Sequence, residues 1–269
     1  MKYLRILLTV AVAFAAAIPA TADTTIGTPI ASLPVLISKP GKYRVTKSLV
    51  MSGANTAIVV LARDVVIDLN GFSITGTPDV DSDNVCIVVN APNTIIRNGT
   101  IRKFDTAISD LAGAYGTTVE DVFCLGQAST GIRFAAAESL LRRVVVRSVG
   151  AQDDSPDAIF GFNLSGNSVI TDCLIQNIPV RAGVTANVGI RLAGGSHIIR
   201  DTEVHRALGT GVAINADTST IVERLRVREC GTGLTVSGGK IPLLRDSTIR
   251  DCITSTSGTF DDGGRNSID

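Results

Sequence analysis

Residues 210–227 read TGVAINADTSTIVERLRV, and residues 232–249 read TGLTVSGGKIPLLRDSTI, which is the same pattern one repeat later in the chain. Each copy opens with alternating apolar and polar residues around a glycine, Gly211 or Gly233. An apolar pair follows, and five residues after its second member stands another apolar residue, Val227 or Ile249. Alternation with a period of two indicates strands with one buried face. A unit of about 22 residues is too short for a strand–helix–strand crossover, so it predicts one coil of a solenoid.

The same pattern extends toward the N-terminus. Counted at the second residue of each apolar pair, the steps between successive copies differ in length, and we expect the longer steps to carry loops. The copies are Leu69 with Ile74, Ile95-Ile96 with Ile101, Val119 with Cys124, Leu140-Leu141 with Val146, Val169-Ile170 with Ile175, and Ile198-Ile199 with Val204. In this register Val204, Val227 and Ile249 are predicted to stack inside one core.

A polar residue occupies the turn between the two strands of most copies. It is Asn98, Asp121, Asp172, Asp201 or Asp246, and residues of this type tolerate a left-handed backbone. Arg143 and Arg224 interrupt this column. Upstream, residues 38–43 (SKPGKY) are followed by residues 65–72 (VVIDLNGF).

On these residues, 55–253 resemble the right-handed parallel β-helix family of pectate-lyase-like exported proteins. The resemblance implies an all-β, single-stranded right-handed parallel β-helix of about eight coils. Residues 23–54 are predicted to cap its N-terminal end, and residues 254–269 form a polar C-terminal tail. Residues 1–22 contain a basic start, a run from Ile6 to Ile18 that is apolar except for Thr9, and small residues before position 23, which predicts a signal peptide and export to the periplasm or medium.

Composition excludes some functions. The 269 residues include 25 Lys and Arg and 25 Asp and Glu. The chain therefore has no net positive charge that would attract nucleic acid. After residue 22 no apolar run is long enough to span a membrane. His197 and His205 lack nucleophile or metal-ligand spacing. Cys230 and Cys252 fall in one column of adjacent coils, where a buried apolar stack is favoured over a disulfide.

The predicted ligand face is the outer side of the glycine-containing strands. The residue two after each glycine points outward, which places Arg133, Asn163 and Arg191 on consecutive coils. The two arginines are then two strand spacings, or roughly 10 Å, apart. Long loops adjoin this strip and carry Asp153, Asp154, Asp157 and Arg181. The planar guanidinium of arginine binds carboxylates through two hydrogen bonds, which favours an acidic ligand. The alternative is that the two arginines pair with these loop aspartates on a solvated face.

A third loop alternates carboxylates at Asp79, Asp81 and Asp83. Such spacing suits a hard cation such as calcium, while a solvated acidic loop without cofactor is the alternative. The resemblance implies an outer face that binds acidic sugars. The family's enzymatic motifs are absent: there is no Trp, no Gly-His-Gly and no Asp-Pro-His. The sequence therefore favours a secreted protein that binds an acidic polysaccharide, and leaves open a lyase or epimerase, or a structural or adhesive envelope protein.

Overall fold

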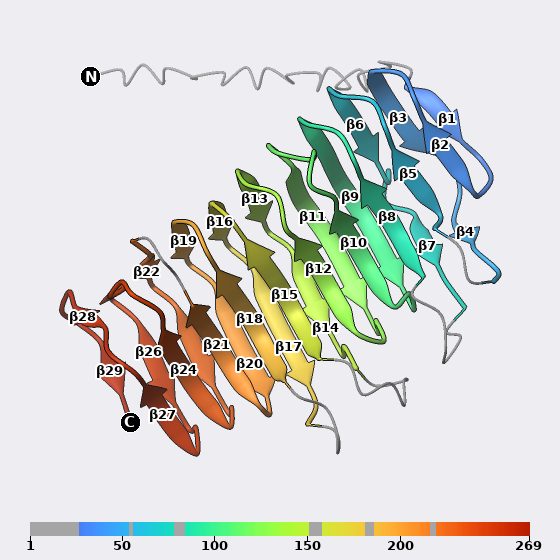
Figure 1. Cartoon of the computed structure of the whole chain (residues 1–269). Coiled ribbons are helices and arrows are strands. Elements are labelled where there is room, and N and C mark those ends of the chain that lie inside the picture. Colours follow the sequence, from blue (N-terminus) through green and yellow to red (C-terminus); the bar gives the residue numbers. More distant parts are fainter. Residues whose placement is uncertain (1–26, 54–55, 78–83, 151–157, 181–185, 216–218) are drawn as a thin grey trace, which may run out of the picture.

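The computed structural model describes residues 27–53, 56–77, 84–150, 158–180, 186–215 and 219–269, and the statements below concern these residues. All paired strands are parallel and belong to two sheets, one of ten strands and one of nineteen. The coils stack along a single axis from the blue to the red end of the chain (Figure 1). Each coil contributes one strand to the ten-stranded sheet and two stretches to the larger sheet, which we call arm 1 and arm 2.

The ten-stranded sheet contains β2 (Val35–Ile37), β5 (Ile58–Val60), β8 (Val85–Val89), β10 (Thr106–Asp110), β12 (Thr130–Phe134), β15 (Ile159–Ser165), β18 (Asn187–Ala193), β21 (Thr210–Asn215), β24 (Thr232–Ser237) and β27 (Thr254–Ser257). Arm 1 contains β1 (Thr28–Ile30), β3 (Gly41–Val45), β6 (Val65–Asp68), β13 (Ser139–Arg142), β16 (Ser168–Thr171), β19 (His197–Arg200), β22 (Ile221–Glu223), β25 (Leu243–Arg245) and β28 (Asp261–Asp262). Arm 2 contains β4 (Leu49–Val50), β7 (Ser73–Thr75), β14 (Val145–Arg147), β17 (Leu174–Ile178), β20 (Glu203–Ala207), β23 (Arg226–Arg228), β26 (Thr248–Arg250) and β29 (Ser267–Ile268). Strands β9 (Thr94–Arg102) and β11 (Thr118–Leu125) run through both arms.

The predicted register of the core is confirmed. Val204 pairs with Val227, and Val227 pairs with Ile249, on successive strands of arm 2. None of the three side chains is more than 1% exposed. Because an inward column repeats in every coil, the interior is one continuous apolar stack along the axis of the solenoid.

The turn between the two arms is a single residue with a left-handed backbone. Its φ is between 48° and 62° at every such position from Asn70 to Asp246. Arg143 and Arg224, predicted to interrupt the polar column, adopt the same conformation, with φ of 51° and 50°. Each forms a bidentate ion pair with the aspartate of the preceding coil, Asp121 or Asp201, at 2.6–2.7 Å. The arginines therefore continue the column by pairing across coils.

The first and last described segments extend the coil stack. In the segment predicted as an N-terminal cap, β2, β3 and β4 pair with β5, β6 and β7 of the next coil. Residues 254–269, predicted as a polar tail, contain β27, β28 and β29, which pair with β24, β25 and β26. These pairings make the segment a short final coil with polar strands.

The five cysteines, Cys230 and Cys252 among them, are free thiols. The predicted signal peptide, residues 1–22, lies outside the described residues. Within the described part of the chain, no helix has the length and apolar character needed to cross a bilayer.

Candidate functional site

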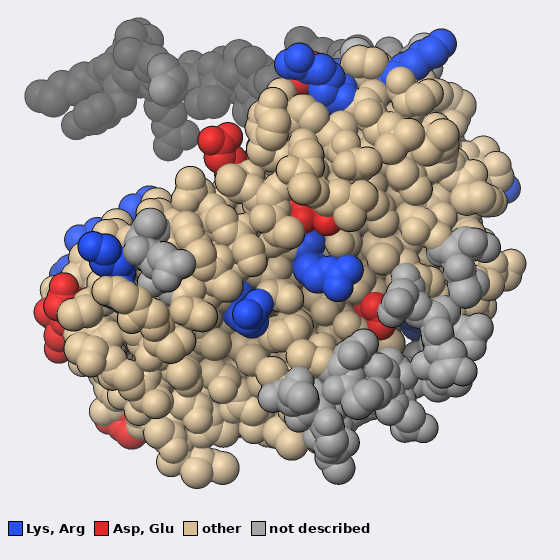
Figure 2. Space-filling view, viewed as in Figure 1, with Lys and Arg blue, Asp and Glu red and all other residues tan. Residues whose placement is uncertain are grey.

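The predicted strip lies on the outer face of the ten-stranded sheet. Arg133 of β12 pairs in register with Asn163 of β15, which pairs with Arg191 of β18. Arg133 is exposed, while Asn163 and Arg191 are half-buried. The flanking positions in this column carry short side chains, Ser109 on one side and Ala213 on the other. In Figure 2, two separate basic groups stand in the middle of a face that is otherwise largely neutral.

Arg191 is held in place by two contacts. Its Nη1 donates a hydrogen bond to Oδ1 of Asn163 at 2.9 Å, and its guanidinium carbon lies 5.8 Å from the centre of the Phe160 ring. A cation at this distance is attracted to the face of an aromatic ring. A guanidinium has five N–H donors, so most of them remain available to a ligand after the bond to Asn163. The side chain is therefore preorganised and still able to bind an oxyanion.

Arg133 stands near a carboxyl group that is already satisfied. Asp110 is 5% exposed and accepts hydrogen bonds from the backbone N–H groups of Ala135 and Ala136, at 2.6 and 3.0 Å. Burial raises the pKa of Asp110, and these bonds together with the charge of Arg133 offset this only in part. Arg133 itself makes no hydrogen bond or ion pair with the described residues. Within the described part of the chain, its guanidinium therefore has donors available for an anion.

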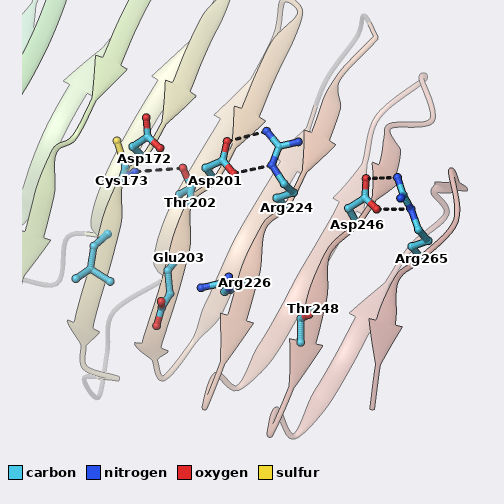
Figure 3. A pocket seen from close by; sticks show the side chains of 11 residues that line it. Asp172, Cys173, Asp201, Thr202, Glu203, Arg224, Arg226, Asp246, Thr248 and Arg265 are labelled. Carbon is cyan, nitrogen blue, oxygen red and sulfur yellow. Dashed lines mark hydrogen bonds and ion pairs between the residues drawn. The ribbon is translucent and has the colours of Figure 1, made fainter. Parts of the chain in front are cut away.

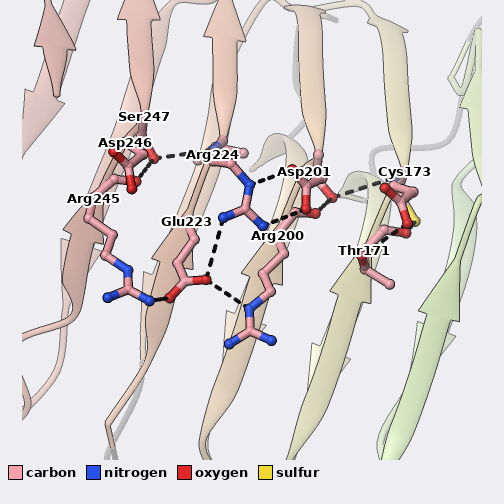
Figure 4. A network of polar contacts seen from close by, with 12 residues as sticks. Thr171, Cys173, Arg200, Asp201, Glu223, Arg224, Arg245, Asp246 and Ser247 are labelled. Atoms are coloured by element: carbon pink, nitrogen blue, oxygen red, sulfur yellow. Dashed lines mark hydrogen bonds and ion pairs between the residues drawn. The ribbon is translucent and has the colours of Figure 1, made fainter. Parts of the chain in front are cut away.

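Arginines on the arms are bonded differently. The side chain of Glu223 is 4% exposed and forms ion pairs with one arginine from each neighbouring coil (Figure 4). Nε of Arg200 lies 2.9 Å from one carboxylate oxygen, and Arg245 bonds the other. Burial acts to raise the pKa of Glu223, but the bond from Arg245 and the charges of both arginines outweigh it and hold this pKa below its ordinary value. Glu223 thereby neutralises arginines of both neighbouring coils, whereas neither strip arginine has a described carboxylate partner.

A groove of about 880 Å³ follows the turn between the two arms from Asp172 to Arg265 (Figure 3). Sequence reasoning did not single it out. Two of its ion pairs, Asp201 with Arg224 and Asp246 with Arg265, cross its floor between neighbouring coils. The alternation of Asp and Arg at this turn position is the signal in the sequence that could have located it. Asp201 and Asp246 are thus neutralised across the coils, whereas Asp172 and Arg226 in the same groove form no ion pair with the described residues.

Several predicted site residues cannot be placed relative to the strip. Asp153, Asp154, Asp157 and Arg181 lie outside the described residues, as do Asp79, Asp81 and Asp83 of the predicted calcium loop. Among the residues that the structure describes, no cluster of three or more His, Cys, Asp or Glu side chains is arranged to hold a metal ion. The calcium site therefore stays a prediction.

The two histidines lie in different environments. His197 is inside the coil stack, where its Nε2 lies 2.5 Å from the carbonyl oxygen of Gly194. His205 is half-buried on arm 2, and its Nε2 lies 3.1 Å from a carboxylate oxygen of Glu229. Neither histidine is on the ten-stranded sheet, so neither serves the strip.

Comparison with known proteins agrees with this architecture. The family model described as a right-handed β-helix region matches residues 157–268. The enzymatically active domain of bacteriophage CBA120 tailspike protein 2 has a similar structure, with a TM-score of 0.59 at 13% identity; the match covers 83% of this chain and 41% of that domain. No curated protein matches the chain.

Two glucanase structures are more distantly similar. The catalytic domain of a GH87 α-1,3-glucanase solved with tetrasaccharides matches with a TM-score of 0.42, 10% identity, and coverage of 86% of this chain and 64% of that one. The catalytic unit of a thermostable GH87 α-1,3-glucanase from Streptomyces thermodiastaticus strain HF3-3 matches with a TM-score of 0.34 and 14% identity. This match covers 88% of this chain and 64% of that one. The chain thus spans about two fifths of the tailspike domain and just under two thirds of the glucanase chains. The stacked parallel strands and one-residue turns give the described residues the fold of a right-handed parallel β-helix, and the family model matches residues 157–268 of it.

Proposed function

We propose that the protein binds an acidic polysaccharide on the outer face of the ten-stranded sheet, with Arg133, Asn163 and Arg191 as the recognition strip. The observation that carries the proposal is the fixed position of Arg191, which is held by Asn163 and Phe160 and has no carboxylate partner among the described residues. Similarity to the tailspike domain supports the fold alone, so the strip provides the argument for a ligand.

The geometry favours carboxylate groups on an extended polymer. A guanidinium binds a carboxylate through two parallel hydrogen bonds, which a neutral hydroxyl cannot reproduce. Arg133 and Arg191 are separated by one intervening strand, so they are roughly 10 Å apart along the solenoid axis. A polymer lying along this axis would present successive acidic groups to the two arginines. Asn163 between them offers its amide N–H groups to hydroxyl or carboxylate oxygens.

Among the described residues, the groups that surround the strip favour binding over catalysis. In this column Ser109 and Ala213 flank the three strip residues, and the buried carboxyl group of Asp110 is occupied by two backbone N–H groups. None of these groups is placed to act as a general acid or base on a bound sugar. A lyase or epimerase is the alternative, and incubation with polyuronates separates it by producing new unsaturated ends or changed uronate stereochemistry.

The test is calorimetric titration with acidic and neutral polysaccharides of matched length. We expect the full chain to bind the acidic polymers, more weakly as salt increases, and not the neutral ones. The double variant Arg133→Ala/Arg191→Ala should lose at least tenfold in affinity with an unchanged melting temperature. Arg226→Ala removes an exposed arginine of arm 2 that forms no ion pair with the described residues; it is the matched control and should bind as the parent does. Equal binding by the double variant and the parent, or no binding by the parent, would refute the proposal.

A further inference from the structure

A second set of left-handed turns lies where arm 2 leads into the ten-stranded sheet. One residue per coil has a φ between 54° and 68° at this corner, and the successive residues are Lys103, Gly126, Ser148, Asn177, Arg206, Glu229 and Asp251. The preceding residue in each coil ends the outward row of arm 2. Side chains at these two positions therefore stand beside one another along the corner, which is distinct from the strip of Arg133, Asn163 and Arg191.

A notch interrupts the corner at Gly126. Its volume is about 280 Å³, and its lining residues are Arg102, Lys103, Leu125, Gly126, Arg147 and Ser148. A Cβ added to Gly126 would find no atom within 4 Å, so the missing side chain leaves open space. Leu125 pairs in register with Arg102 on one side and Arg147 on the other. Two arginines thus flank a half-buried leucine at the base of the notch.

The cations of the notch lack counter-charges in the described part of the chain. Arg102, Lys103 and Arg147 are exposed, and none of their side chains forms a hydrogen bond or an ion pair there. At other coils the same surface is neutralised: Arg206 on this corner bonds Glu229 at 2.7 Å, and Arg228 on arm 2 bonds Glu203 at 2.6 Å. Within the described residues, three cations without ion pairs therefore surround one cavity, and this concentration of positive charge favours a multiply charged oxyanion.

An apolar cleft continues from the notch along the same corner. It has a volume of about 580 Å³, and its lining includes Ile178, Pro179 and Leu208, together with Ser148, which also lines the notch. Leu208 is 52% exposed, so its side chain offers apolar surface to a ligand in the cleft. The charged residues of the cleft, Arg206 and Glu229, bond each other. From Gly126 to Leu208 is three coils, or about 14 Å at the spacing of parallel strands.

We infer that the notch and the cleft together form a binding site for an anionic amphiphile, a single-chain lipid with a phosphate headgroup. The phosphate would lie in the notch among Arg102, Lys103 and Arg147, because arginine forks match its oxygens. The alkyl chain would lie over Pro179 and Leu208, where it removes apolar surface from water. An acidic polymer would use the cations and leave the apolar cleft uncovered, so the two cavities in series favour the lipid.

The inference is tested by calorimetric titration of the full chain with dodecyl phosphate below its micellar concentration. Inorganic phosphate and dodecyl maltoside are the comparison ligands. We expect dodecyl phosphate to bind at least tenfold more tightly than either of them, since only it supplies both parts of the ligand. The double variant Arg102→Ala/Arg147→Ala should bind dodecyl phosphate at least tenfold more weakly than the parent. Leu208→Ser should reduce the affinity for dodecyl phosphate to nearly that for inorganic phosphate.

Two further variants sharpen the test. Gly126→Asn should also abolish binding, because asparagine tolerates the left-handed backbone and its side chain would fill the open notch. Arg226→Ala removes a cation from arm 2 outside both cavities and should leave binding unchanged. Equal affinity for dodecyl phosphate and inorganic phosphate, undiminished binding by Gly126→Asn, or displacement of the lipid by an acidic polysaccharide would overturn the inference.

Discussion

His197 occupies an unusual position for an ionisable residue, inside the coil stack. Residues two before the anchor of each arm 1 strand form an inward polar column that includes Ser139, Ser168, His197 and Thr220. His197 is 0% exposed, and its Nδ1 has no hydrogen-bond partner among the described residues. Burial lowers the pKa of His197, and its contact with the Gly194 carbonyl offsets this only in part. The ring is therefore held neutral in the folded protein.

This environment makes stability depend on pH. The folded-state pKa of His197 is lower than the value near 6.5 of an unfolded histidine, so below about pH 6.5 the unfolded chain binds more protons than the folded one. The free energy of unfolding should then fall as pH drops from 6.5 toward the folded pKa, by at most about 1.4 kcal/mol per pH unit. Denaturant unfolding of the parent and of His197→Gln between pH 7.5 and 5 measures the effect.

The variant should show a flatter pH profile than the parent over this range. His205→Gln is the control, because His205 lies on arm 2 beside Glu229 and is not inside the stack. Parallel profiles for the parent and His197→Gln would show that His197 does not titrate on unfolding.

At the scale of the strand, a column of glycines allows the ten-stranded sheet to bend onto arm 2. A Cβ at Gly211 would lie 2.6 Å from Cγ1 of Val227 and 2.7 Å from the carbonyl oxygen of Gly233. A Cβ at Gly189 or Gly233 would meet equivalent atoms of its own neighbours at 2.4–2.6 Å. These glycines are required for close approach of backbone and core, and their even spacing along the sequence reflects this contact.

Gly211→Ala should therefore destabilise the protein. The added methyl group overpacks the core and pushes on backbone that cannot move independently of its neighbours, at a cost of about 1–3 kcal/mol. For a chain of this length that lowers the melting temperature by roughly 2–4 °C per kcal/mol. Gly239→Ala is the matched control, because a Cβ there meets nothing within 4 Å. Equal melting of the two variants would contradict the packing argument.

Across the whole molecule, stability and solubility depend on how the open end of the coil stack is closed. The final coil carries β27, β28 and β29, whose residues are mostly Thr, Ser and Asp. It covers strands β24, β25 and β26, behind which Leu234, Leu244 and Ile249 are at most 1% exposed. Polar, short edge strands discourage pairing with another chain.

Removing residues 254–269 should lower the melting temperature by at least about 5 °C and cause self-association. The deletion uncovers paired strand edges and apolar ends of the core, and neighbouring coils supply most of each other's stability in a solenoid. Light scattering after size-exclusion chromatography, at several protein concentrations, detects the association. The full chain with Ile253→Ser is the control, because Ile253 is 92% exposed and is a second apolar site for self-association. A deletion variant with the parent's mass and melting temperature would contradict this account.

The sequence by itself determined the solenoid and its register. Apolar residues recur at fixed offsets in each coil, so Val204, Val227 and Ile249 could be assigned to one column without coordinates. The outward direction of Arg133, Asn163 and Arg191 followed from the same alternation. Burial of apolar side chains is a local, repeated requirement, and it therefore leaves a repeated trace in the sequence.

Only the tertiary structure decided which charges are neutralised. Arg143 and Arg224 read as departures from the turn column, yet each bonds an aspartate of the coil before it. Conversely, Arg102 and Arg147 resemble any surface arginines until the structure shows that both line the notch at Gly126 and form no ion pair with the described residues. Such pairing depends on side-chain reach between coils that lie a full repeat apart in the sequence, and the apolar period does not encode it. The fold could thus be predicted from local chemistry, whereas the binding sites arise from contacts between coils.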